Sequence, residues 1–321
     1  MPYYDQAMIS RSSRPVRDGL PSFMADRGGI NWITPPSLAS ITTTGGSAAI
    51  GQVTAAQDAA LVTKTHQFIT CGAPQTAQIY AVTNILEFGN MMGRTFPELT
   101  EAWIALGEAA FSRFAENLLL TQIAAGSTAV TTQQRLGASR DILNYATLAA
   151  VAYRNRHRMD PNAQLVAMFP YWLIGAIQSD EWMQFNNSTV EATDVTQAII
   201  ERWFASRNIR VIWFEDGVGP GNPAAQIFPT QAAGQLNAWP TVVQWYLFHE
   251  GAWLVLDGGT LDLGIVRDST LNSQNRYQMF FESFENIVFV GVESLRIRST
   301  ICVNGATSGT VAPTTICQGG S

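Results

Sequence analysis

The sequence has few charged residues and almost no lysine. Charged residues make up 14% of the 321 residues and hydrophobic residues 46%, whereas soluble proteins usually carry about a quarter charged residues. Lys64 is the only lysine, so every other basic side chain is an arginine. Arginine suits interfaces between chains, because its planar guanidinium pairs bidentately with carboxylates and is weakly hydrated. A genome rich in arginine codons explains the bias equally well. The composition nevertheless predicts that much of the surface is covered by other protein chains.

Long apolar runs are also missing. No stretch of about 18 apolar residues occurs, so a membrane span is not expected. The N-terminus lacks the basic stretch and apolar core of a secretory signal, which makes the cytoplasm the default compartment. The net charge is −6 without any long basic run, which argues against bulk nucleic-acid binding.

Motifs of catalysis and metal binding are absent. The histidines His66, His157 and His249 are far apart, and the sequence contains no H-E-x-x-H, no G-x-S-x-G and no G-K-[ST] after a glycine cluster. The cysteines have no C-x-x-C spacing. We therefore expect no enzyme, no catalytic residue, no metal and no cofactor.

Two cysteines near the C-terminus leave an alternative open. Cys302 and Cys317 are expected to be free buried thiols, or else to form a disulfide once the protein has left a reducing cell.

The first third of the chain contains little that could form a core. Residues 1–30 are polar, with arginines at positions 11, 14 and 17 and no apolar periodicity, which predicts an extended arm. Residues 31–75 are rich in alanine, threonine and glutamine. We expect both segments to depend on neighbouring chains for their order. A β-rich run over 78–86 predicts a strand that returns from a long hairpin.

One long helix is predicted from Pro97 to Gly126. Pro97 suits the first helical position, Glu98 and Glu101 suit the positive end of the helix dipole, and Gly126 suits a left-handed cap. Large apolar residues recur every three or four positions and form one continuous stripe: Leu99, Trp103, Leu106, Ala110, Phe114 and Leu118. Such a helix would be about 40 Å long, a spine for something larger than one small domain.

The rest of the chain alternates helices and strands. We expect helices over 137–153 and 193–206, a strand, turn and short helix over 165–180, a strand over 209–214, a loop over 216–235, mainly strands over 242–298 and a mobile tail over 303–321. The basic run over 154–158 is interpreted as a solvated face, with docking on a neighbour's acidic surface as the alternative. The fold class is therefore α+β.

Several blocks of sequence resemble one known family. They are the residues 27–32 (RGGINW) with Pro35 and Pro36, 86–90 (LEFGN), 94–98 (RTFPE), 250–253 (EGAW), 256–259 (LDGG), 261–264 (LDLG), 266–269 (VRDS) and 280–285 (FFESFE). Together they resemble the HK97-fold major capsid proteins of tailed double-stranded-DNA bacteriophages, especially siphophages that infect actinobacteria. The resemblance extends over about residues 25–300.

The resemblance implies a division of the chain. It gives an N-terminal arm (1–30), an E-loop region (31–95), a P-domain spine helix (96–140), an A-domain (141–240), a P-domain sheet that returns to the A-domain (241–300) and a C-terminal tail (301–321). The implied function is self-assembly into hexamers and pentamers of an icosahedral shell around phage DNA. An encapsulin-type nanocompartment shell is the alternative, and a soluble hydrolase or sugar-binding β-domain is a third hypothesis.

The resemblance also implies partners and a location. They are other copies of the chain, a scaffolding protein, a portal at one vertex, candidate decoration proteins and packaged double-stranded DNA bound without sequence specificity, with no membrane. No charged helical segment precedes the arm, so we expect the scaffold to be a separate protein. The location is the virion, after assembly in the host cytoplasm.

Lys64 falls in the implied E-loop region, where the namesake of the fold has a lysine that forms an isopeptide bond with an asparagine of a neighbouring subunit. It is a candidate cross-link site on position alone. A solvated lysine is the alternative, and we expect that outcome.

Overall fold

The chain folds as a mixture of helices and sheets, as expected. The structure is a computed structural model that describes residues 12–25, 27–41, 48–132, 137–184, 195–215, 239–259 and 262–303. The helices are α1 (Pro15–Gly19), the 3₁₀ helix η1 (Leu38–Ser40), α2 (Ala55–Ala59), α3 (Asn90–Thr95), α4 (Pro97–Ala125), α5 (Ser139–Arg156), α6 (Trp172–Gln184), α8 (Gln197–Ala205) and α9 (Ser269–Ser273). The strands are β1 (Ser22–Met24), β2 (Gly29–Trp32), β3 (Gln75–Gln78), β4 (Tyr80–Gly89), β5 (Thr128–Thr132), β6 (Leu165–Pro170), β7 (Ile209–Phe214), β8 (Val242–His249), β9 (Trp253–Asp257), β10 (Asp262–Val266), β11 (Arg276–Phe289) and β12 (Ser294–Thr300).

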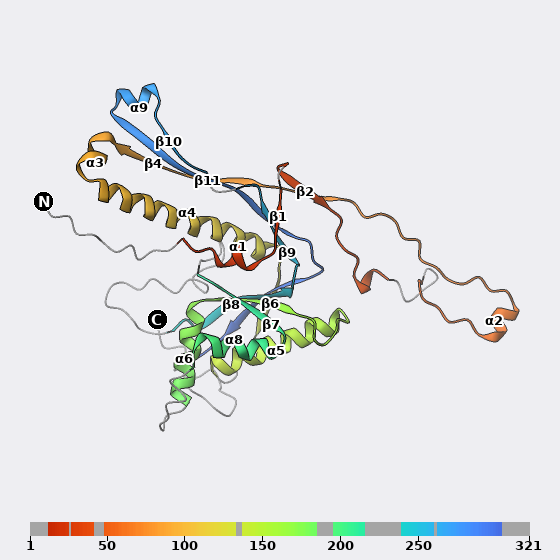
Figure 1. Cartoon of the computed structure of the whole chain (residues 1–321). Coiled ribbons are helices and arrows are strands. Elements are labelled where there is room, and N and C mark those ends of the chain that lie inside the picture. The colour runs from red at the N-terminus through yellow and green to blue at the C-terminus, as the bar shows by residue number, and fades with distance from the viewer. Residues whose placement is uncertain are drawn as a thin grey trace.

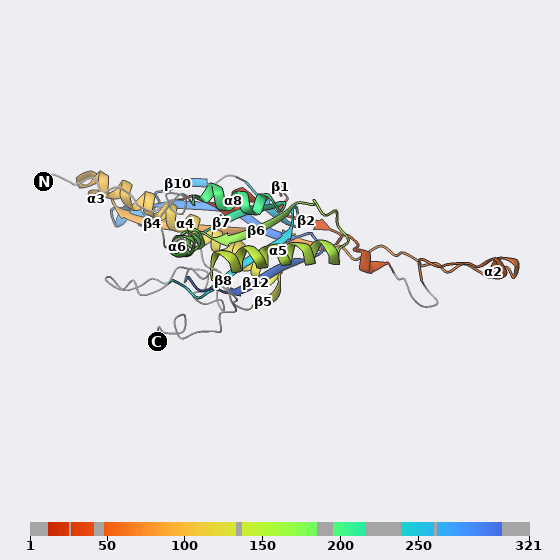
Figure 2. The ribbon, with the colours of Figure 1, turned by 90° about the horizontal axis from the view of Figure 1, so that it is seen from below.

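The strands form two five-stranded sheets and one two-stranded sheet. The first sheet has the order β1-β9-β11-β10, with β4 also paired to β11, and the second has the order β5-β12-β8-β6-β7. The small sheet pairs β2 with β3 and begins a long hairpin. Figure 1 shows α3 and α9 at one end of the molecule and α2 at the other, and Figure 2 shows that the molecule is much longer than it is thick.

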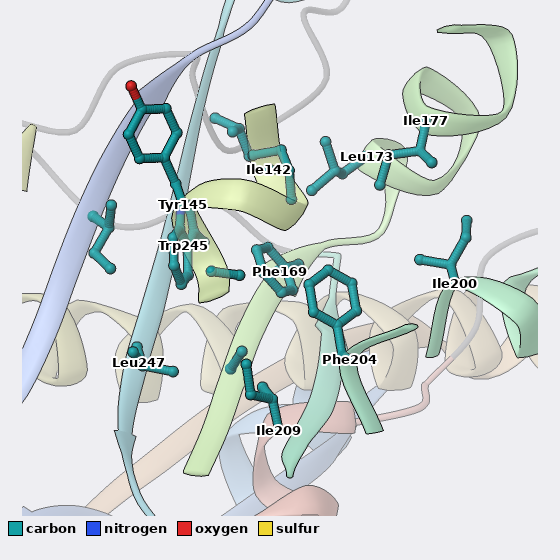
Figure 3. Close-up of a cluster of buried hydrophobic side chains, with 14 of the residues drawn as sticks. Ile142, Tyr145, Phe169, Leu173, Ile177, Ile200, Phe204, Ile209, Trp245 and Leu247 are labelled. Carbon is teal, nitrogen blue, oxygen red and sulfur yellow. The ribbon is translucent and has the colours of Figure 1, made fainter. Parts of the chain in front are cut away.

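The second sheet has a large apolar core on the face that α5, α6 and α8 cover (Figure 3). Trp245 lies at its centre, stacked on Phe169 with 5.0 Å between the ring centroids. The indole Nε1 of Trp245 donates a hydrogen bond to Oγ of Ser299 at 2.9 Å, so the one polar atom of this side chain is satisfied. The predicted strand over 209–214 is confirmed as β7. The helices predicted over 137–153, within 165–180 and over 193–206 are confirmed as α5, α6 and α8.

Helix α4 connects the two sheets. Its N-terminal half packs on β4 and β11, where Phe111 stacks on Phe281 at 6.3 Å between centroids. Its C-terminal half places Leu119, Leu120 and Ile123 on the face of the second sheet opposite α5. Its 29 residues correspond to about 43 Å, so the predicted length is confirmed.

The predicted left-handed cap at Gly126 is wrong. Gly126 has φ −86° and ψ 2°, which any residue can adopt. Its lack of a side chain matters for another reason: a Cβ there would lie 2.6 Å from the ring of Trp253. The glycine allows the end of α4 to pack against β9.

Residues 1–30 are not a simple extended arm. Pro15 begins the short helix α1, and Val16 and Leu20 are buried in the core between α4 and the second sheet, with 0% and 6% of their surfaces exposed. β1 then pairs in parallel with β9. The described part of the arm from residue 12 onward is thus a component of the subunit's own core, contrary to the expectation. Arg11 and the residues before it lie outside the described residues.

The basic run over 154–158 is also only partly a solvated face. Arg154 is buried, and its guanidinium donates hydrogen bonds of 3.0 Å to the carbonyl oxygens of Ala163, Arg207 and Asn208. It ties the end of α5 to the loop before β7. The sequence did not predict α9, and the predicted loop over 216–235 lies outside the described residues.

Candidate assembly surfaces

The hairpin, defined as residues 33–74 between β2 and β3, has no core of its own. Of its described residues only Ala48 is buried. Leu61 and Phe68 are 89% and 84% exposed, although full burial of such a side chain stabilises by about 1.5–3 kcal/mol. The hairpin extends far from the body in both views (Figures 1 and 2). Its exposed apolar side chains form a surface that another chain can cover.

Helix α2 organises the far part of the hairpin. Thr54 caps it: the hydroxyl of Thr54 accepts a hydrogen bond from the backbone N–H of Gln57 at 3.4 Å, and the side chain of Gln57 accepts one from the N–H of Thr54 at 2.9 Å. Lys64 follows α2 directly in the chain and is exposed. None of the described residues contacts its ammonium group through a hydrogen bond or an ion pair. The expectation that Lys64 is a solvated lysine and not a cross-link site stays a prediction.

The apolar stripe expected on α4 is present but faces away from the sheets. Trp103, Leu106, Phe114 and Leu118 are 49%, 40%, 57% and 37% exposed. The face that packs on the sheet is lined instead by small residues and Phe111; a Cβ on Gly107 would lie 2.6 Å from the side chain of Leu86. The helix therefore has a second apolar face that the described part of the subunit leaves uncovered.

A buried ion-pair cluster fixes α1 to α4 and to the first sheet. Both terminal nitrogens of Arg14 donate to the carboxylate of Glu285, at 2.7 and 2.8 Å. Nε of Arg14 lies 3.6 Å from Oε2 of Glu116, and the other oxygen of Glu116 accepts a hydrogen bond from the backbone N–H of Val16. Arg17 lies 3.4 Å from Glu285 and 3.0 Å from Asp257. The two arginines neutralise carboxylates that would otherwise be costly to bury.

A second polar cluster lies where α5 meets the turn between β11 and β12. Glu293 accepts from Arg156 at 2.5 Å and lies 2.7 Å from Nε2 of His157, and the hydroxyl of Tyr153 donates to the carbonyl oxygen of Glu293 at 2.8 Å. Burial raises the pKa of Tyr153 to about 12, so its hydroxyl stays protonated at any ordinary pH. His157 and His249 line a cleft of about 430 Å³ beside the base of the hairpin. The cluster joins elements, and it lacks a nucleophile paired with a base.

Within the described ranges, no three histidine, cysteine, aspartate or glutamate side chains are grouped so that they could hold a metal ion. In the same part of the chain, no helix is both long and apolar enough to cross a membrane.

Cys302 is 3% exposed and takes part in a disulfide, contrary to the expected free thiol. Its predicted partner, Cys317, lies outside the described residues, so the Cys302–Cys317 pairing stays a prediction. Cys71 is free and exposed in the hairpin.

Solved structures share this fold over nearly the whole chain. A subunit of the mature capsid of bacteriophage PhiM1 matches 94% of this chain and 90% of its own, with a TM-score of 0.53 and 10% identity. The capsid of Ralstonia phage GP4 matches 98% and 96%, with a TM-score of 0.51 and 10% identity. A chain of Mycobacterium phage Cain matches 94% and 94%, with a TM-score of 0.51 and 11% identity. No family model and no curated protein sequence matches the chain.

The chain therefore has the HK97-like fold of phage capsid subunits, which confirms the fold class expected from the sequence. Sequence reasoning missed the partners of Arg14 and Arg17. Glu116 lies 102 positions from Arg14, and Glu285 lies 271 positions from Arg14, so no local pattern connects these residues. The spacing of the arginines by three was the one visible sign that they share a face.

Proposed function

We propose that the chain is the major capsid protein of a tailed double-stranded-DNA phage. It assembles into the hexamers and pentamers of an icosahedral shell that encloses the DNA, and it performs no catalysis. Two observations support this function together: the fold is that of phage capsid subunits over nearly the full length, and the hairpin exposes Leu61 and Phe68 at its far part. An exposed apolar hairpin without a core suits a protein that works only among copies of itself.

The proposal assigns parts to the division of the chain given by the family resemblance. The hairpin is the E-loop and α4 is the spine. The first sheet with α3 and α9 belongs to the P-domain, which moves β4 and α3 out of the E-loop region given over 31–95. The second sheet with α5, α6 and α8 belongs to the A-domain. Residues 1–30 and 301–321 are the arm and the tail. A scaffolding protein, a portal at one vertex, decoration proteins and packaged DNA complete the set of proposed partners. The proposed location is the virion, after assembly in the host cytoplasm.

Expression of the full chain with and without its genomic neighbours tests this function. We expect closed shells in cryo-electron micrographs and, in particles from infected cells, protein that co-purifies with double-stranded DNA. A chain that stays a small species on a sizing column at high concentration contradicts the proposal. Shells that enclose a cargo enzyme rather than DNA would instead establish the encapsulin-type alternative.

A further inference from the structure

The distal end of the first sheet carries a polar cleft. The distal end is defined here as α3, α9, the strand ends between them and the first two turns of α4 (residues 90–104 and 262–279), and it lies opposite the hairpin in Figure 1. Asn90 and Asn275 hold it together: the backbone N–H and the side-chain amide of Asn90 each donate to Asn275 at 3.0 Å. The cleft has a volume of about 510 Å³ and is lined in part by Arg94 and Arg267.

The two arginines of this cleft have no carboxylate partner among the described residues. The guanidinium of Arg267 lies over the ring of Tyr277, 5.1 Å from its centroid, which restricts its orientation. By contrast, the neighbouring Arg276 is paired with Glu87 at 2.6 Å. Two arginines that line one cleft without a carboxylate partner repel each other, so a cleft of this kind favours a carboxylate.

The same end of the molecule also carries two exposed carboxylates. Glu98 and Glu101, in the first turns of α4, are exposed, and within the described part of the chain no basic side chain pairs with them. The same end also exposes large apolar side chains: Met91, Phe96 and Trp103 are 65%, 46% and 49% exposed. Exposed aromatic residues together with arginine and other charged residues are typical of protein–protein interfaces.

We propose that the distal end is an interface between copies of this chain, in which Arg94 and Arg267 of one copy pair with Glu98 and Glu101 of another. Each copy carries both the arginines and the carboxylates. The carboxylates of a second copy can therefore pair with the arginines of the first. Pairing across the contact also covers Met91, Phe96 and Trp103. The inference rests on the proposed function, because it names one of the contacts by which shell subunits join.

Charge reversal tests the contact. Arg94→Glu with Arg267→Glu brings four carboxylates together and should reduce the yield of assembled particles roughly tenfold or more. Glu98→Arg with Glu101→Arg should reduce it similarly. The quadruple variant that carries all four changes restores opposite charges and should recover particles. Recovery is the decisive result, because a merely damaged surface is not repaired by two further substitutions.

Controls separate this inference from folding and from the proposed function. Glu108→Arg, on the same helix, and Arg158→Glu, at the end of α5, are exposed changes and should leave assembly unchanged. Thermal unfolding of unassembled subunits should be the same in all variants, because these side chains make no ion pair with the described residues. Reversal variants that assemble like the wild type overturn the inference. A quadruple variant that folds but fails to assemble also overturns it. So does normal assembly of the Glu98→Arg, Glu101→Arg variant, which would indicate that the arginines bind another ligand such as phosphate. A wild-type chain that never assembles contradicts the proposed function instead.

Discussion

The second sheet buries its large apolar side chains, whereas the hairpin exposes Leu61 and Phe68. In the sheet, Trp245, Phe169 and Phe248 are 0% exposed, and they lie between helices on one face and α4 with α1 on the other. In the hairpin, Leu61 and Phe68 are more than four-fifths exposed. Burial in the second sheet thus supplies free energy that folds the subunit, whereas the described hairpin residues gain almost none within it. Under the proposed function, the hairpin is stabilised when a neighbouring copy covers it.

Helix α4 combines both behaviours along one element. Its inner face packs Phe111 and Ala115 against the first sheet, and its outer face leaves Trp103 and Phe114 about half exposed. The comparison between body and hairpin is therefore a comparison of surfaces rather than of separate domains. Substitutions on each kind of surface should separate folding from assembly.

The largest expected effect on folding comes from the centre of the second sheet. Trp245→Ala removes a fully buried ring and leaves Ser299 without its hydrogen-bond donor, so the free energy of unfolding should fall by about 3–5 kcal/mol. Chemical denaturation of unassembled subunits measures it. Trp182→Ala is the matched control, because Trp182 is 61% exposed on α6 and should change little. Equal effects of the two substitutions would refute the idea that the second sheet is the folding core.

A smaller loss is expected at the buried ion-pair cluster. Arg14→Ala leaves Glu116 and Glu285, which are 0% and 4% exposed, short of a counter-charge, while Arg17 still neutralises part of Glu285. Breaking a buried pair by removing one partner costs about 3 kcal/mol or somewhat more. The same denaturation experiment checks this value.

Arg276→Ala is the control for Arg14→Ala, since it breaks the exposed pair with Glu87 and should leave stability unchanged. A fall in stability confined to Arg14→Ala would establish that residues 12–20 belong to the body. Equal stability of both variants with the wild type would restore the earlier expectation of an arm that the subunit does not need.

The positions of the helices and strands of the body were largely predictable from the sequence. Which face of each element is buried was not predictable. Periodicity predicts where α4 begins and ends, because Pro97 and the spacing of apolar residues are local. It does not predict which face is buried: the stripe with Trp103 and Phe114 is more apolar than the face with Gly107 and Ala115, yet the sheet needs the smaller residues for a close approach. The role of Arg14 depends on Glu116 and Glu285, which are distant in the sequence, so only the tertiary fold reveals it. The hairpin's lack of a core was predictable, because it follows from composition alone.

The hairpin should respond in the opposite sense to the core. Leu61→Ser combined with Phe68→Ser changes only exposed side chains, so the free energy of unfolding should stay within about 0.5 kcal/mol of the wild type. The yield of assembled particles should fall, because each side chain that a neighbour covers contributes about 1.5–3 kcal/mol to the contact. Sedimentation of assembly reactions measures the yield. A marked loss of subunit stability, or normal particles, would contradict the division between body and hairpin.

The smallest expected effect is at Lys64, which tests whether the hairpin is held by covalent bonds or by contacts alone. An isopeptide bond needs an unprotonated amine beside an asparagine and a carboxylate that removes the proton. None of the described residues contacts the amine of Lys64, so a neighbour would have to supply both groups. We therefore expect non-covalent cohesion. Particles boiled in detergent and reductant should give one band near 35 kDa, and Lys64→Arg, which keeps the charge, should give the same band and the same yield of particles. A ladder of multimers that survives reductant and disappears in Lys64→Arg would show that the hairpin is covalently cross-linked in the shell.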